Sequence, residues 1–165
     1  MSTQAATTWV NGVHHIGMSV PDIDAARAFF VDLLGLKELR RGPMGGEVLD
    51  RITRLTGTSG RILHLAAGNA YLEIFEFKSP APDPLDPQRP VNNYGYTHLA
   101  FDVSDTDAVC ERLKKAGIEF HCDVMAVYGV KTVYGRDPFG NVFELQQVVA
   151  EEHVKRLPAV VAAEG

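Results

Sequence analysis

Two histidines and two glutamates occupy equivalent places in an internal repeat of the chain, and these are His15, His98, Glu73 and Glu144. Residues 12–25, GVHHIGMSVPDIDA, match residues 95–108, GYTHLAFDVSDTDA, at six of fourteen positions when 83 is added to each number. This match aligns the two histidines. An offset of 71 lays residues 69–74 over residues 140–145 and aligns the two glutamates. Each repeat therefore supplies one imidazole and one carboxylate.

The neighbouring residues His14 and His15 are not equivalent under this repeat, because Thr97 stands opposite His14. Side chains of neighbouring residues on a β-strand point to opposite faces. At most one of the two histidines can therefore face a given pocket, and the repeat selects His15.

Two imidazoles and two carboxylates would meet in one cavity if the repeats are related by a pseudo-two-fold axis. Such a donor set suits one borderline divalent ion in a roughly octahedral site, with positions left for water or substrate. It lacks the thiolates that are typical of structural zinc sites. The four side chains are therefore candidate ligands of one divalent metal ion, and Mn²⁺, Co²⁺, Ni²⁺, Fe²⁺ and Zn²⁺ are all compatible with them.

A purely structural role is the alternative for each of these residues taken alone. A single histidine in an apolar strand is more often a hydrogen-bonded core residue than a ligand. Glu73 could lie on a solvated face, because Glu76 on the opposite face of the same run, YLEIFEF, has similar neighbours. Four such residues at equivalent positions favour the metal site, since two buried carboxylates would be costly without a cation.

Each repeat is expected to fold as a strand, a helix and three further strands. In the first repeat, apolar spacing and turn residues predict a helix over 23–34 and strands at 13–20, 36–41, 62–66 and 70–77. Residues 42–60 are expected to form a loop with a short amphipathic turn. In the second repeat, the same signals predict a helix over 106–116 and strands at 96–103, 118–122, 131–136 and 142–148. The order predicts an α+β fold of two tandem βαβββ modules.

The chain is expected to divide into five segments, which are a flexible N-terminal segment (1–11), a first module (12–77), a proline-rich connector (78–93), a second module (94–149) and a short helix with a tail (150–165). The connector holds five of the nine prolines, and such a segment cannot pair as a central strand. It prefers an extended, semi-rigid path.

Composition and charge exclude several classes of partner. The chain has 16 Lys and Arg against 21 Asp and Glu, for a net charge of −5, which argues against binding to nucleic acid or an anionic membrane surface. No apolar stretch is long enough to cross a bilayer, and the N-terminus, MSTQAATTW, lacks the features of a signal peptide. Two cysteines make no disulfide framework. The expected location is the cytoplasm.

The motifs VHHIGMSVPD, AYLEIFEF, YGYTHLAFDVSD and YGRDPFGNVFELQQ occur in the order found in a known family. The chain resembles the vicinal oxygen chelate superfamily, which includes glyoxalase I, bleomycin resistance proteins, methylmalonyl-CoA epimerase, extradiol dioxygenases and fosfomycin-resistance enzymes. The resemblance implies that the paired modules form a curled mixed β-sheet cup around a metal ion whose ligands are His15, Glu73, His98 and Glu144. It also implies a homodimer.

A carboxylate at the position of Glu73 implies an isomerase, an epimerase or a glyoxalase-type lyase. Such an enzyme would move a proton next to a carbonyl group of a small oxygenated substrate through a metal-stabilised enolate, with Glu144 or Glu73 as the base. The connecting region resembles the subgroup named for a valiolone-type sugar epimerase. Two alternatives stay open, which are an Fe(II)-dependent dioxygenase of the same superfamily and a metal-free protein that binds a small molecule.

Several tyrosines and arginines are candidate contacts for the small-molecule substrate, and these are Tyr128, Tyr134, Arg136, Arg51 and Arg54. A role as an ordinary surface or loop residue is the alternative for each of them.

Overall fold

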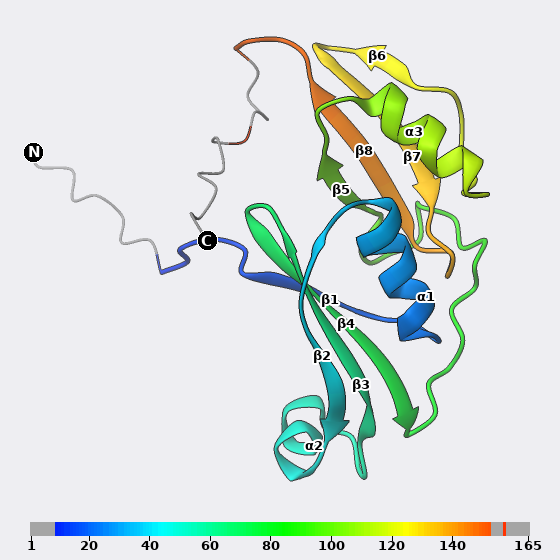
Figure 1. Ribbon diagram of the computed structural model, residues 1–165. Coiled ribbons are helices and arrows are strands. Elements are labelled where there is room, and N and C mark those ends of the chain that lie inside the picture. Colours follow the sequence, from blue (N-terminus) through cyan, green and yellow to red (C-terminus); the bar gives the residue numbers. More distant parts are fainter. Residues whose placement is uncertain (1–8, 153–156, 158–165) are drawn as a thin grey trace, which may run out of the picture.

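The structure, a computed structural model, describes residues 9–152 and residue 157 and contains two four-stranded sheets (Figure 1). The first half of the chain, here called the N-module, comprises β1 (His15–Ser19), α1 (Ile23–Arg27), η1 (Ala28–Leu33), β2 (Lys37–Gly45), α2 (Glu47–Thr53), β3 (Ser59–Ala67) and β4 (Ala70–Ser79). The second half, the C-module, comprises β5 (Leu99–Asp102), α3 (Thr106–Lys115), β6 (Met125–Val127), β7 (Val130–Arg136) and β8 (Val142–Val148).

The two sheets have the same topology. The strand order is β1-β4-β3-β2 in the N-module and β5-β8-β7-β6 in the C-module. In each module the first strand pairs in parallel with the last, and the remaining pairs are antiparallel. This repetition confirms the expected α+β fold of two βαβββ modules. The sheets remain separate, and neither closes on itself in the described part of the chain.

The helix of each module begins at an aspartate of the repeated motif. The Asp22 carboxylate accepts hydrogen bonds from the backbone N–H groups of Asp24 and Ala25, and the Asp105 carboxylate accepts one from Ala108. These bonds satisfy donors that the first helical turn leaves without an intrahelical partner. The caps therefore fix where each helix starts after the strand that begins at or directly after a candidate histidine.

The two modules pack against each other through their helix-covered faces. The Phe29 ring, in the π-helical segment η1, lies 5.4 Å from the Phe143 ring of β8, and the Phe30 ring lies 6.4 Å from that of Phe101 in β5. Both η1 phenylalanines are buried in a core that draws residues from both sheets. Figure 1 shows the helical segment of the N-module between the two sheets. The opposite face of each sheet therefore stays outside this shared core.

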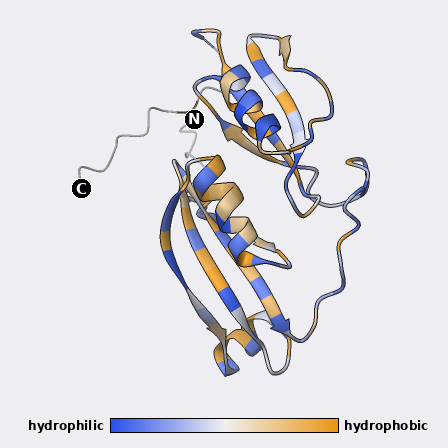
Figure 2. Cartoon of the chain, turned by 45° about the vertical axis from the view of Figure 1, so that its right-hand side comes forward, coloured by the Kyte–Doolittle hydropathy of each residue, from blue (hydrophilic) through white to orange (hydrophobic). Residues whose placement is uncertain are grey.

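Strand alternation is visible along both sheets as stripes of hydrophobic and hydrophilic residues (Figure 2). In β4, Leu72 and Ile74 are buried towards the helices, whereas Glu73 between them is half-buried on the other face. This alternation of side chains determines which residues can meet on each face.

Three expectations about elements were wrong in detail. Residues 42–45 belong to β2 rather than to a loop, and the helix expected over 23–34 is α-helical only as far as Arg27. The strand expected at 118–122 is reduced to a bridge between Phe120 and Gly135. The strand that pairs with β7 is instead β6, whose three residues are all exposed and so carry no alternating pattern. The short helix expected within 150–165 falls mostly on residues outside the described part.

Candidate metal centre

The N-module brings His15 and Glu73 together on the face that lies away from the core. The Nε2 atom of His15 is 3.5 Å from Oε2 of Glu73. The parallel pairing of β1 with β4 places Gly17 beside Glu73, so the histidine lies two residues before the partner of the glutamate. We call His15 and Glu73 the N half-site.

The C-module repeats this arrangement with a closer contact. The Nε2 atom of His98 is 3.0 Å from Oε2 of Glu144. Ala100 is the partner of Glu144 between β5 and β8, so the histidine again lies two residues before the partner of the glutamate. We call His98 and Glu144 the C half-site. The equal register explains why the same two residue types meet in both modules.

A turn before β8 fixes the strand that carries Glu144. The Asp137 carboxylate accepts hydrogen bonds from the backbone N–H groups of Phe139 and Asn141 and from the Asn141 side chain, each at 2.9 Å. Burial raises the pKa of the Asp137 carboxyl, and these hydrogen bonds oppose the rise because they stabilise the ionised form. The motif DPFGN thus sets the start of the final strand.

The second oxygen of each glutamate contacts a residue on the neighbouring strand. In the N half-site, Nε2 of His64 on β3 is 3.5 Å from Oε1 of Glu73. In the C half-site, the Thr132 hydroxyl on β7 donates a 2.5 Å hydrogen bond to Oε1 of Glu144. In each half-site, Oε2 of the glutamate therefore faces the histidine, and Oε1 contacts a residue of the neighbouring strand.

The half-sites differ in exposure. The side chains of His15 and Glu73 are 44% and 29% exposed, whereas those of His98 and Glu144 are 25% and 11% exposed. Tyr134 covers part of the C half-site, with its ring centroid 4.6 Å from that of His98. Burial and the nearby Glu144 charge raise the pKa of the Tyr134 phenol, so this hydroxyl stays protonated at neutral pH. The C half-site is the more enclosed of the two.

Glu76 has a different environment from Glu73 despite its similar sequence neighbours. It is 3% exposed on the helix-facing side, and its carboxylate accepts a hydrogen bond from Arg61 and another from Lys78. The Arg61 bond lowers the pKa of the Glu76 carboxyl. Glu76 is therefore neutralised by structural ion pairs, whereas the N half-site glutamate faces imidazoles.

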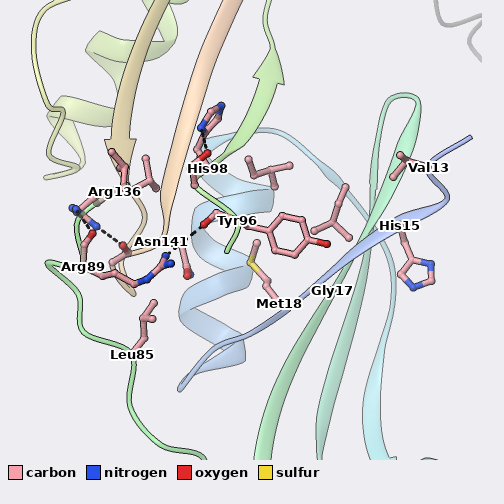
Figure 3. Close-up of a pocket in the computed structure, with 16 residues that line it drawn as sticks. Val13, His15, Gly17, Met18, Leu85, Arg89, Tyr96, His98, Arg136 and Asn141 are labelled. Atoms are coloured by element: carbon pink, nitrogen blue, oxygen red, sulfur yellow. Dashed lines mark hydrogen bonds between the residues drawn. The ribbon is translucent and has the colours of Figure 1, made fainter. Parts of the chain in front are cut away.

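The structure does not gather the four candidate ligands within one chain. Among the residues that it describes, no group of three or more His, Cys, Asp and Glu side chains is arranged to hold a metal ion. The His15 and His98 rings point away from each other (Figure 3). The cause is the packing of the modules, since the residues that flank each glutamate, such as Leu72 and Phe143, occupy the shared core. Alternation then turns both glutamates outwards.

A cavity of about 580 Å³ lies between the edge strands β1 and β5. Its wall is mostly apolar, with Ile16 and Met18 from β1 and Val142 from β8, and both candidate histidines border it. Tyr96, which lies between β4 and β5, borders this cavity in Figure 3. Of the four candidate ligands, the two histidines line this cavity, and the two glutamates are not among its lining residues.

Of the candidate substrate contacts, only Tyr134 lies at a half-site. The Arg136 guanidinium instead donates hydrogen bonds to the carbonyl oxygens of Arg89, at 3.0 Å, and Gly140, at 2.8 Å, and so holds the connecting segment. Tyr128 is 96% exposed in the turn between β6 and β7. The other two arginines, Arg51 and Arg54, are exposed at α2 and at the residue that ends it.

A family model for the glyoxalase/bleomycin resistance protein/dioxygenase superfamily matches residues 12–145, which include both half-sites. The chain belongs to this superfamily. Membership supports a vicinal oxygen chelate enzyme or binding protein, and it agrees with the repeated module that the sheets display. In the described residues, no helix is both long and apolar enough to cross a membrane.

Relatives of the superfamily cover most of the chain. The 2-epi-5-epi-valiolone epimerase of an Actinomyces species is 29% identical over 143 residues, which span 81% of this chain and 77% of that protein. The uncharacterised protein YaeR of Escherichia coli K12 is 31% identical over 138 residues, which span 82% and 95%. The crystal structure of a glyoxalase family protein from Bacillus cereus is 25% identical and has a TM-score of 0.81, covering 89% of this chain and all of that one. Such a score needs both modules to superpose together, so that superfamily member arranges its modules in the same way.

Neither His64 nor Thr132 was predicted from the sequence as a site residue, although the pairing of one hairpin could have identified His64. The hairpin of β3 and β4 turns at Gly68 and Asn69, and counting outwards from this turn pairs His64 with Glu73. The contact of Thr132 is diagonal, since Tyr134 is the direct partner of Glu144. The superfamily motifs alone do not identify it.

Proposed function

We propose that the protein is a divalent-metal-dependent isomerase or epimerase that moves a proton next to a carbonyl group of a small oxygenated substrate. The observation that carries this proposal is the equivalent His–Glu pair in each module, with Nε2 facing Oε2 at 3.5 Å in one and 3.0 Å in the other. A residue pair that served packing alone would have no reason to recur at the same register on the face of each sheet that lies away from the core.

The donor set fits a divalent ion of the borderline class. Each half-site offers one imidazole nitrogen and one carboxylate oxygen, and the carboxylates supply the charge that would compensate the cation. The residues that would hold the ion are His15 and Glu73 with His98 and Glu144. An ion held there would act as a Lewis acid towards a carbonyl oxygen of the substrate.

We propose further that a second copy of the chain completes each site. In the described residues, β1 bonds only to β4 and β5 bonds only to β8, so both strands beside the cavity have a free edge. A two-fold axis would bring the N half-site of one chain to the C half-site of its partner, and the same contact would form twice. The resulting homodimer would contain two equivalent sites with four protein ligands each.

The carboxylates are the groups of this chain that can move a proton. Glu144 or Glu73 would remove the proton from the carbon next to the carbonyl and return it to the same or a neighbouring atom, which leaves the overall composition unchanged. The Tyr134 hydroxyl, protonated at neutral pH, can donate a hydrogen bond to a substrate oxygen near His98. Epimerisation is supported over lysis by the name of the Actinomyces relative.

Turnover is expected to require a divalent metal, to proceed without oxygen and to exchange a substrate C–H proton with solvent. Four protein ligands would leave two positions open on a six-coordinate ion, and a substrate that binds through two oxygens would fill both, with no position left for dioxygen. The test is to incubate small 2-oxo or 3-oxo compounds with the metal-loaded protein in heavy water under nitrogen. Mass spectrometry then measures deuterium incorporation into each compound.

Two controls accompany this experiment. Protein stripped with a chelator should incorporate deuterium no faster than buffer, and addition of the ion should restore the rate. Turnover that stops when oxygen is removed would contradict the proposal in favour of a dioxygenase. Tight binding of a compound by the stripped protein, with no deuterium incorporated after metal loading, would indicate a metal-free binding protein instead.

A further inference from the structure

Each candidate ligand histidine is contacted by the side chain of the residue that precedes it. The Nδ1 atom of His14 is 2.8 Å from Nδ1 of His15, and the Thr97 hydroxyl oxygen is 2.9 Å from Nδ1 of His98. In both cases the other ring nitrogen, Nε2, faces a glutamate. Both contacts occur where the chain enters a strand, since β1 begins at His15 and β5 at Leu99.

The two contacting residues are equivalent in the repeat but chemically unrelated. His14 and Thr97 occupy positions 83 apart, as do the histidines that follow them. An imidazole ring and a short hydroxyl side chain differ in volume and in shape. What they share is a lone pair that can accept a hydrogen bond. Because a hydrogen-bond acceptor recurs at both equivalent positions, we take the acceptor to be the property that these positions require.

An acceptor at Nδ1 has a direct consequence for metal binding. A neutral imidazole carries its proton on one nitrogen only, and the other nitrogen keeps the lone pair. When Nδ1–H donates to a fixed acceptor, Nε2 presents its lone pair outwards, and the ring orientation is fixed as well. The Nε2 atoms are the ones that face Glu73 and Glu144.

We infer that His14 and Thr97 are positioning residues that accept a hydrogen bond from Nδ1–H of the following histidine and so hold its Nε2 ready to bind the metal. This inference rests on the proposed function. The His14 ring is itself held in place, because it makes an edge contact with His15 at 5.1 Å and a tilted contact with Tyr71 at 5.4 Å. His14 therefore acts on the N half-site although it is not a ligand.

The test compares variants that lose the acceptor with variants that keep it. Thr97→Val preserves shape and removes the hydroxyl, whereas Thr97→Ser keeps it. His14→Leu removes the acceptor, whereas His14→Asn keeps one near the position of Nδ1. Zn²⁺ affinity is measured by competition with a chelating dye. We expect Thr97→Val and His14→Leu to bind Zn²⁺ about 10- to 100-fold more weakly, the usual cost of losing an outer hydrogen-bond partner of a ligand. Thr97→Ser and His14→Asn should bind within about threefold of wild type, because they retain the acceptor.

A second readout separates positioning from a general effect on folding. In Zn²⁺-loaded wild type and Thr97→Ser, nitrogen-15 NMR should show the His98 Nδ1 proton, because the hydrogen bond slows its exchange with water. This signal should be lost in Thr97→Val, while the melting temperature of the metal-free protein stays that of wild type.

Each contrary result has a distinct meaning. Wild-type affinity in both Thr97→Val and His14→Leu would overturn the inference and leave the proposed function intact, because water would then serve Nδ1 equally well. Equal weakening in Thr97→Ser and Thr97→Val would also overturn it, since the hydroxyl would not be the cause. A wild-type protein that binds no Zn²⁺ through His15 and His98 would overturn both the proposed function and this inference.

Discussion

Replacing His98 by alanine should lower the affinity of the protein for Zn²⁺ or Mn²⁺ by more than about 100-fold. This loss exceeds the loss expected when a ligand keeps its place but loses its hydrogen-bond partner. The His98 imidazole is one of four proposed ligands and the closest to its glutamate, with Nε2 and Oε2 separated by 3.0 Å. Its removal leaves Glu144 without the nitrogen donor that would share the cation. Metal content after dialysis and isothermal titration of the stripped protein both measure the effect. His15→Ala should give a comparable loss.

A folded control is available in the same chain. His121 is exposed and belongs to neither half-site. Its ring lies 6.3 Å from the ring of Tyr134, which is not a proposed ligand, so His121→Ala should retain wild-type affinity for the metal. Far-UV circular dichroism of the metal-free variants should match wild type, because the His15 and His98 side chains lie outside the shared core. Undiminished metal content in His15→Ala or His98→Ala would remove that residue from the ligand set.

Mixing two inactive variants should restore activity if each site is shared between two chains. One variant carries His15→Ala with Glu73→Gln and lacks the N half-site, and the other carries His98→Ala with Glu144→Gln and lacks the C half-site. A mixed dimer then contains one site with all four ligands and one site with none. At equal amounts and free exchange, about half of the dimers are mixed, so about a quarter of wild-type activity and metal content should return.

A matched control uses two variants of the same half-site. His15→Ala mixed with Glu73→Gln produces no complete site in any dimer, so activity should not return. Restoration in this control would mean that the variants were not inactive to begin with. Failure of the first mixture after verified subunit exchange would overturn the proposal that two chains share each site.

The strands that carry the half-sites were predictable because each is half-buried. In β8, Phe143 and Leu145 pack into the core on either side of the outward-turned Glu144, and the predicted range 142–148 agrees with the structure. β6 had no such signal, since Met125, Ala126 and Val127 are all exposed and are held only by pairing with β7. The strand expected at 118–122 had the signal but lacks a ladder, because Ile118 and Phe120 pack against the core from a loop. The spacing of apolar residues predicts which side chains are buried, but a segment with buried side chains need not pair with another strand.

The pairs His15–Glu73 and His98–Glu144 were predictable for a different reason, which is that one module repeats the other. The arrangement of the two modules in space could not be predicted from the sequence. It depends on contacts such as Phe29 with Phe143, between residues far apart in sequence, and no local pattern specifies which apolar faces will meet. The expectation that four ligands converge within one chain therefore rested on the repeat alone, and in the described structure the core between the helix-covered faces keeps the two half-sites apart.

The mass of the metal-loaded protein in its native state tests the shared site most directly. Native mass spectrometry of the wild-type chain, loaded with Mn²⁺ or Zn²⁺ and exchanged into a volatile buffer, separates monomers from dimers and counts bound ions. A site shared between two chains predicts a dimer that carries one ion per chain and bare monomers after dissociation. A monomer that retains one ion, or a dimer that binds none after loading, would contradict it.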